Sequence, residues 1–393
     1  MHKLTTALGL PQHRFASIHV VGTNGKSSVT RMAAALLEAN GLRAGAIVSP
    51  HTDRWEQRTL IAGSEVEEGA WTDAVEQVAR AAEGVNRTLA EGEAITQFEA
   101  ATAASFVALA NARVEVTVVE AGLGGRLDAT NTIPSRVTVL TSIGLDHTEW
   151  LGETELEIAA EKLAVLRDQT TLVLGGVSPD VLALATRTAA ERGAAVIQVG
   201  ADTEMATRAP GAFQRRNFAT ACAAAEAFLQ RPLDRNLAEQ VAATVTVPGR
   251  LEQIAERPPA YLDAAHNPDG AAALAEALPA VSGGRRVVAC LAILADKDAA
   301  AMIAALAPAL DRAVCTELPA AALEGHGRPG AHSHPARDLV ALCERVGLRA
   351  EPEPQFAAAL ERARSLAVES PEGVVLIAGS HYAIGPARAI LAT

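Results

Sequence analysis

The chain has 393 residues, of which 49% are hydrophobic, and a formal net charge of −12. This length exceeds what one hydrophobic core usually fills, so we expect two domains. The acidic balance argues against a partner that is nucleic acid or an anionic membrane, because binding either needs a basic face. No apolar stretch reads as a signal peptide or a membrane span, so we expect a cytoplasmic protein.

The first half has the alternating pattern of an α/β fold. Short runs rich in β-branched residues alternate with alanine-rich helical runs, as in a parallel sheet covered by helices. We expect strands near His19–Val21, Gly45–Val48, Val114–Glu120, Val137–Ile143 and Thr171–Leu174, and helices near Ser28–Ala39, Glu68–Gly84, Phe98–Asn111, Thr154–Leu166 and Pro179–Arg192. This pattern predicts a doubly wound, nucleotide-binding domain.

The second half repeats this alternation after Pro258 and Pro259, which break helix and strand alike. Helical runs at Gln214–Leu229 and Asp234–Thr244 precede the break. After it we expect strands near Tyr261–Ala264, Arg286–Leu291, Ala313–Thr316 and Val374–Ala378, and helices near Gly270–Leu278, Asp298–Leu310, Pro335–Val346 and Phe356–Val368. The predicted domains are therefore residues 1–255 and 256–393.

Two segments of the second half read as loops, Glu324–His334 and Glu351–Pro354. The first contains three histidines among glycines and prolines. Because no carboxylate or cysteine stands at ligand spacing, we interpret it as a flexible surface loop and not as a metal site.

A glycine-rich turn joins the first strand to the first long helix. It departs from the common G-x-x-x-x-G-K pattern, because Val20 stands where that pattern begins with glycine. In such a turn backbone N–H groups close on phosphate oxygens, the helix N-terminus adds its dipole and Lys26 adds a full charge. An ordinary strand-to-helix turn is the alternative to a triphosphate cradle built from Gly22, Thr23, Asn24, Gly25, Lys26, Ser27 and Ser28.

Three side chains follow strands whose carboxyl ends meet at one edge of the predicted sheet. Glu120 ends one strand, His147 follows the next, and Ser49 follows Gly45–Val48. Ligands of open α/β sheets bind at this edge, and these groups with phosphate oxygens and water suit Mg²⁺. A strand-end carboxylate that caps the next loop is the alternative for Glu120.

Residue chemistry alone does not decide the roles of two nearby features. The polar loop Thr52–Arg58 suits either an anionic small molecule or solvent. Lys162, on the helix after Gly152, reads as an ordinary solvated lysine.

The chain resembles the folylpolyglutamate synthase/dihydrofolate synthase family, a branch of the Mur ligase superfamily, over nearly its whole length. The ordered motifs that carry the resemblance are Gly22–Lys26, Ser49–His51, Thr96–Glu99, Glu120–Asn131, Asp146–His147, Glu161–Lys162, Pro248–Arg250 and Asp263–Pro268. The segment Gly-Leu-Gly-Gly-Arg-Leu-Asp-Ala-Thr-Asn is specific to the folate branch. This resemblance implies the Mur ligase architecture, with an N-terminal P-loop domain that binds ATP, Mg²⁺ and pterin and a C-terminal Rossmann-like glutamate ligase domain.

The resemblance also implies roles for individual residues. Lys26, Lys162 and His266 match catalytic positions, and Lys162 matches a lysine that is carbamylated to help hold a second metal. Asn217, Arg250 and Asp263 match nucleotide contacts, while Ser49, Glu120, His147 and Lys162 match the Mg²⁺ ligands. The substrate positions are Thr96, Gln97, Phe98, Glu99, Leu127, Asp128 and Ala129 for the pterin, and Ser380 near the incoming glutamate.

Three departures from the family pattern stand out. Ser27 replaces a glycine and resembles the murein ligases, and its hydroxyl could reach Mg²⁺. Gln97 replaces a common aromatic residue, so pterin stacking is expected to rest on Phe98. The segment before the P-loop is short, so we expect less cover over the substrate.

The expected activity is ATP-driven ligation of L-glutamate to dihydropteroate or a reduced folate, in one-carbon metabolism, by a monomer without a redox cofactor. A murein-type ligase is a rival that Ser27 favours and the Arg126–Asn131 segment opposes. The other rivals are a phosphotransferase that stops at the phosphorylated acid and a non-catalytic nucleotide-binding relative. The retained metal-site residues oppose the last of these.

Overall fold

A computed structural model describes residues 1–200, 205–324, 330–369 and 373–391. The chain forms two compact units: Met1–Arg208 with Gln214–Val245, and Ala209–Phe213 with Thr246–Thr393. The expected boundary after Ala255 differs from this division. It falls inside a strand that pairs antiparallel with its neighbour in the second unit.

The first unit is built on an eight-stranded sheet with the order β4-β3-β2-β5-β1-β6-β7-β8. Its strands are β1 (Ala16–Val21), β2 (Ala44–Ile47), β3 (Thr59–Ile61), β4 (Ser64–Glu65), β5 (Val116–Glu120), β6 (Ser135–Leu140), β7 (Thr171–Leu174) and β8 (Ala195–Gln198). The pairs β2–β3 and β3–β4 are antiparallel and the others are parallel. The carboxyl ends of β1, β5, β6 and β2 therefore share one edge.

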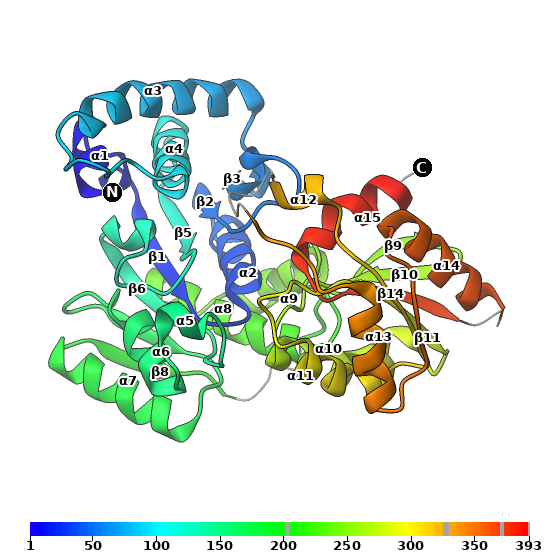
Figure 1. Cartoon of the computed structure of the whole chain (residues 1–393). Coiled ribbons are helices and arrows are strands. Elements are labelled where there is room, and N and C mark those ends of the chain that lie inside the picture. Colours follow the sequence, from blue (N-terminus) through cyan, green and yellow to red (C-terminus); the bar gives the residue numbers. More distant parts are fainter. Residues whose placement is uncertain (201–204, 325–329, 370–372, 392–393) are drawn as a thin grey trace. The chain divides into compact units, whose positions relative to one another are not determined.

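Helices surround this sheet (Figure 1). They are α1 (His2–Ala7), α2 (Lys26–Ala39), α3 (Glu68–Asn86), α4 (Gln97–Asn111), α5 (Thr148–Leu151), α6 (Glu155–Leu163), α7 (Pro179–Glu191), α8 (Ala212–Leu229) and α9 (Arg235–Thr244). One cluster joins α1, α3 and α4 through Leu4, Trp71 and Ala104, and another joins α6 and α7 to β6 and β7 around Leu163. Burial of these two clusters holds the carboxyl edge of the sheet in place.

The second unit contains a six-stranded sheet with the order β13-β12-β11-β14-β10-β9, in which β9 pairs antiparallel with β10 and the other neighbouring strands pair in parallel. Its strands are β9 (Glu252–Glu256), β10 (Pro259–Leu262), β11 (Val287–Leu291), β12 (Arg312–Cys315), β13 (Ala350–Pro352) and β14 (Val374–Ala378). Its helices are α10 (Pro268–Ser282), α11 (Ala299–Leu306), α12 (Ala320–Glu324), α13 (Ala336–Arg345), α14 (Phe356–Val368) and α15 (Ile384–Leu391). Two apolar clusters are centred on α10, α11 and α13, and on α14 and α15, so both sheet faces are covered. The α/β prediction is confirmed for both halves.

Two segments expected as loops are partly ordered on this sheet. In Glu351–Pro354 the loop prediction is wrong, because residues 350–352 form the edge strand β13, where Pro352 lies opposite Cys315. An edge strand tolerates proline because its outer side needs no N–H donor. Of the three histidines in Glu324–His334, His326 lies outside the described residues. His332 and His334 flank Ser333, which forms a bridge to Leu294.

The part of the chain that the structure describes contains no helix long and apolar enough to cross a membrane.

Candidate functional site

The glycine-rich turn is fixed between β1 and α2 by the segment after β6. Thr23 N–H donates to the Ser142 carbonyl at 2.8 Å, and Asn24 N–H donates to Ser142 Oγ at 3.1 Å. A Cβ atom on Gly22 would lie 1.9 Å from Thr141 Oγ1, so only glycine allows this approach. The expected strand Val137–Ile143 ends early, at Leu140, and the residues that follow hold the turn.

Asn217, a predicted nucleotide contact, lies against the glycine-rich turn at the start of α2. Gly25 is the N-cap at φ 84°, and a Cβ there would lie 2.5 Å from Asn217 Oδ1. Lys26 Nζ donates to the Thr23 carbonyl at 3.0 Å. The structure therefore brings together the turn, its lysine and Asn217 at the N-terminus of α2, an arrangement suited to phosphate.

Glu120 connects the turn to the segment after β2. Its side chain is 2% exposed. Oε1 accepts from the Ser27 hydroxyl at 2.9 Å and Oε2 accepts from Ser49 N–H at 3.0 Å. Three predicted residues therefore meet at the carboxyl edge of the sheet, and their oxygen donors are the kind that Mg²⁺ prefers.

His147 and Lys162 lie on the segments that follow β6. His147 has φ 52° as the N-cap of α5, with Nε2 3.8 Å from Asp146 Oδ1. Lys162 lies in the last turn of α6 and is 4% exposed, so it is not a solvated lysine. Burial, and next the charge of Lys26, lower the pKa of the Lys162 amine to about 7, although Asp146 opposes this. Near neutral pH a large share of this amine is therefore uncharged.

Groups of three His, Cys, Asp or Glu side chains that could hold a metal are absent from the described residues. The predicted metal set contains only one carboxylate and one imidazole, so this finding leaves it a prediction.

The predicted pterin residues lie at the start of α4 and in the glycine-rich loop after β5. Thr96 and Glu99 form a capping box, in which Glu99 N–H donates to Thr96 Oγ1 at 3.2 Å. Phe98 lies against the loop, since a Cβ on Gly122 would be 2.3 Å from Phe98 Cζ. Gln97 is exposed.

The other predicted pterin residues, Leu127, Asp128 and Ala129, lead into a short 3₁₀ turn at Ala129–Thr132. Leu127 is 91% exposed, although it is large and apolar. Asp128 is the N-cap of the turn and accepts from Thr130 N–H at 2.9 Å. Ala129 is buried.

Sequence reasoning missed a cluster beside Phe98. In the 3₁₀ turn Trp55–Arg58, the Arg58 side chain is 8% exposed and Nε donates to His51 Nδ1 at 2.8 Å. The guanidinium lies 4.5 Å from the centre of the Trp55 ring and 5.9 Å from that of Phe98. Arg58 is thus buried between aromatic rings and does not face solvent. The aromatic and arginine residues at Trp55 and Arg58 were the available signal.

The second unit places three predicted residues around the end of β10. Asp263 is 4% exposed and accepts from Ala265 N–H at 2.8 Å and Leu251 N–H at 2.9 Å. Burial raises the pKa of its carboxyl, whereas the charges of Arg250 and His266 and these two hydrogen bonds act to lower it. His266 Nδ1 lies 2.9 Å from the Ala264 carbonyl, so Nδ1 is the protonated donor and Nε2 is the ring nitrogen left for other partners.

Ser380 lies apart in sequence, after β14. It is 1% exposed, caps a 3₁₀ turn at His381–Ala383 and accepts from Tyr382 N–H at 3.3 Å.

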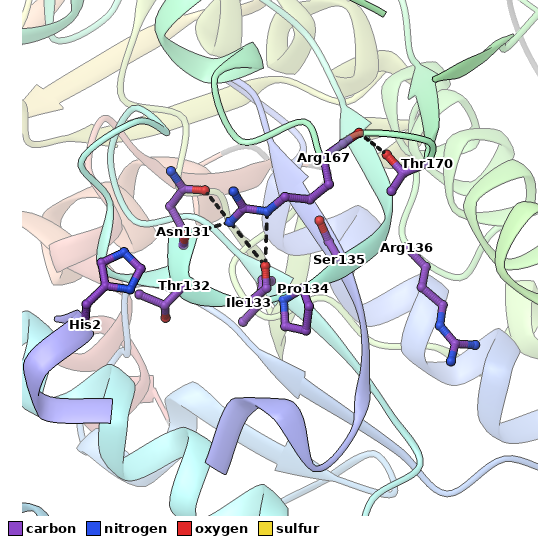
Figure 2. A pocket seen from close by; sticks show the side chains of 9 residues that line it. All are labelled: His2, Asn131, Thr132, Ile133, Pro134, Ser135, Arg136, Arg167 and Thr170. Atoms are coloured by element: carbon purple, nitrogen blue, oxygen red, sulfur yellow. Dashed lines mark hydrogen bonds between the residues drawn. The ribbon is translucent and has the colours of Figure 1, made fainter. Parts of the chain in front are cut away.

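A cavity of about 630 Å³ lies elsewhere in the first unit, near the amino end of β6 (Figure 2). None of the predicted site residues lines it. Its lining residues are His2, Asn131, Thr132, Ile133, Pro134, Ser135, Arg136, Arg167 and Thr170.

Comparisons with known proteins agree with the motifs. The family model of the Mur ligase glutamate ligase domain matches residues 249–381. Dihydrofolate synthase/folylpolyglutamate synthase of Mycobacterium tuberculosis is 35% identical over 357 residues, which cover 80% of this chain and 72% of that protein.

Solved structures extend the similarity to the fold. The structure of M. tuberculosis folylpolyglutamate synthase complexed with ADP has a TM-score of 0.90 and 32% identity, covering all of this chain and 94% of that one. A bifunctional folylpolyglutamate synthase/dihydrofolate synthase with Mn, AMPPNP and L-glutamate bound has a TM-score of 0.81 and 28% identity, covering 99% and 93%. With its P-loop, its Ser27–Glu120–Ser49 cluster and its glutamate ligase domain, the chain belongs to the folylpolyglutamate synthase/dihydrofolate synthase family of ATP-dependent ligases.

Proposed function

We propose that the enzyme joins L-glutamate to the carboxylate of dihydropteroate, of a reduced folate, or of both, and releases ADP and phosphate. The observation that carries the proposal is the position of Glu120, whose buried carboxylate binds the P-loop Ser27 hydroxyl and Ser49 N–H. This arrangement suits a metal–triphosphate complex at the carboxyl edge of the sheet. The names of the relatives support the folate substrate and oppose a murein precursor.

The reaction divides into two steps. A carboxylate is a poor electrophile, so one of its oxygens first attacks the γ-phosphorus of ATP and ADP leaves, giving an acyl phosphate. The amine of glutamate then attacks the acyl carbon, phosphate departs with the former carboxylate oxygen, and the amine loses a proton. Lys26 and the N–H groups of the turn offset the negative charge on the phosphate oxygens during the first step.

Ser49, Glu120 and His147 would hold Mg²⁺, and the Ser27 hydroxyl would add a further oxygen ligand. Bound there, Mg²⁺ would supply positive charge to the phosphate oxygens. Two metal sites are part of the proposal, the second with Lys162. Addition of the neutral Lys162 amine to CO₂, with loss of a proton, would give a carbamate. That anion can bind a cation, whereas the ammonium form of lysine cannot.

The acceptor is proposed to bind beside Phe98, Leu127 and the loop after β5. Trp55 and Arg58 extend the aromatic surface of Phe98, so stacking does not rest on one ring despite Gln97. An exposed apolar side chain such as Leu127 suits contact with a flat heterocycle.

Residues of the second unit complete the assignment. Arg250 is proposed for the nucleotide phosphates, Asp263 for the ribose region, His266 for catalysis and Ser380 for glutamate. The same proposal describes a monomer in the cytoplasm that uses neither a redox cofactor nor a nucleic-acid partner.

The test is phosphate release from ATP and Mg²⁺, with L-glutamate and either 7,8-dihydropteroate or tetrahydrofolate as the acid. Turnover with dihydropteroate places the enzyme in folate synthesis, and turnover with tetrahydrofolate alone makes it a tail-extending enzyme. Release that does not depend on glutamate would instead identify a phosphotransferase. If only a cell-wall precursor supports turnover, the folate proposal fails and the ligase chemistry survives.

A further inference from the structure

A chain of hydrogen bonds connects the middle of β1 with the proposed pterin loop, Gly122–Leu127. His19 lies on β1 and is fully buried, and its Nε2 is 2.8 Å from Thr130 Oγ1. The Thr130 hydroxyl in turn lies 2.5 Å from Asp128 Oδ1. The other carboxylate oxygen of Asp128 accepts from Leu123 N–H at 2.8 Å, so the chain of hydrogen bonds ends on the backbone of the glycine-rich loop.

The direction of these bonds follows from the donors available. A carboxylate can only accept, so the single hydroxyl proton of Thr130 points to Asp128. The Thr130 oxygen must then accept from His19, which fixes the imidazole as the Nε2–H tautomer. Burial lowers the pKa of His19 to about 3, so the ring is neutral. Its Nδ1 has no hydrogen-bond partner among the described residues.

A second support holds the same turn from the segment after α6. The Arg167 guanidinium donates through Nη2 to the Asn131 carbonyl at 2.7 Å and to Asn131 Oδ1 at 2.9 Å. It also reaches the Ile133 carbonyl through Nε at 3.3 Å (Figure 2). The turn is therefore held on both sides of Thr130, while Leu127, two residues before the turn begins, stays exposed.

We propose that His19 and Thr130 are positioning residues for the pterin substrate, acting through Asp128 on the loop at Gly122–Leu127. The proposal rests on the proposed function, in which this loop lines the pterin site. Among the described residues, the His19 side chain bonds to Thr130 and the Thr130 hydroxyl bonds to Asp128, and neither side chain bonds to the glycine-rich turn at Gly22–Ser28. Their loss should therefore weaken binding of the acceptor and leave ATP binding unchanged.

The test compares Thr130→Val, which removes the hydroxyl at nearly constant volume, with Thr130→Ser, which keeps it. Thr117→Val is the matched control, because Thr117 is also fully buried in this sheet and its hydroxyl has no hydrogen-bond partner among the described residues. We expect Thr130→Val to raise the KM for the pterin acid about tenfold, the usual effect of one lost hydrogen bond. The KM for ATP should stay within about twofold, and Thr130→Ser and Thr117→Val should resemble the wild type.

Amide hydrogen exchange at Leu123 gives a readout that needs no substrate. We expect exchange there to accelerate about tenfold in Thr130→Val and to stay at the wild-type rate in Thr130→Ser. Equal exchange in the two Thr130 variants, or equal changes in KM for ATP and acceptor, would overturn the inference. If the wild type turns over neither pterin acid, the proposed function fails, and exchange at Leu123 still decides whether Thr130 orders the loop.

Discussion

Replacing Lys162 with methionine should stabilise the first unit against unfolding. The amine is buried, and its pKa falls from 10.5 to about 7 in the folded protein. The unfolded chain keeps the ordinary pKa, so between these values it binds more protons than the folded state. The difference corresponds to about 4 to 5 kcal/mol lost from the free energy of unfolding at and below pH 7. Methionine has a similar length and carries no such cost.

The sign of the pH dependence separates this effect from packing. Because the folded pKa is depressed, the cost is full below about pH 7 and is relieved as the pH rises toward 10.5. The free energy of unfolding of the wild type should therefore rise, relative to that of Lys162→Met, by about 1.4 kcal/mol for each pH unit above 7. A difference in packing would not change with pH.

The assay is urea unfolding between about pH 6 and pH 9, in buffer freed of CO₂ to prevent carbamylation. Tryptophan fluorescence reports on the first unit alone, since Trp55, Trp71 and Trp150 all lie there. Leu163→Met, at the neighbouring buried position, controls for packing. A stability difference between wild type and Lys162→Met that stays constant over this pH range would refute the reasoning.

Three further substitutions test the site. Lys162→Ala should lower turnover at least about a hundredfold while calorimetry finds ATP affinity nearly intact, and unchanged turnover would refute its role. Glu120→Gln offers one acceptor oxygen to two donors, so we expect the Mg²⁺ concentration for half-maximal turnover to rise about tenfold or more; an unchanged Mg²⁺ titration would contradict the assignment. Phe98→Ala should raise the KM for the pterin acid about tenfold without affecting that for ATP, and a parallel rise in both would point to general disruption.

The nucleotide-binding half of the fold could be predicted because its signals are local. β1, the glycine turn and α2 follow one another directly, and Glu120 and Ser49 each end or follow a buried strand. Parallel pairing then brings these ends to one edge without further information. The hydroxyl of Ser27, noted as a departure, proves to bind Glu120.

The features that escaped prediction depend on distant pairing. β9 and β13 are short, partly exposed edge strands whose residues carry little apolar signal, so only their partners reveal them. The burial of Arg58 between Trp55 and Phe98 joins residues some 40 positions apart, so the aromatic and arginine residues of the loop could not by themselves indicate Phe98 as the partner. Burial of Lys162 likewise follows from packing of α6 and not from its own periodicity.

Oxygen transfer from the acceptor to phosphate tests the central claim most directly. The acceptor acid is prepared with ¹⁸O in its carboxylate and incubated with ATP, Mg²⁺ and L-glutamate, and the released phosphate is analysed by mass spectrometry. An acyl-phosphate mechanism predicts one ¹⁸O atom in each phosphate, formed in step with the glutamate conjugate. Conjugate formation accompanied by unlabelled phosphate would contradict the mechanism.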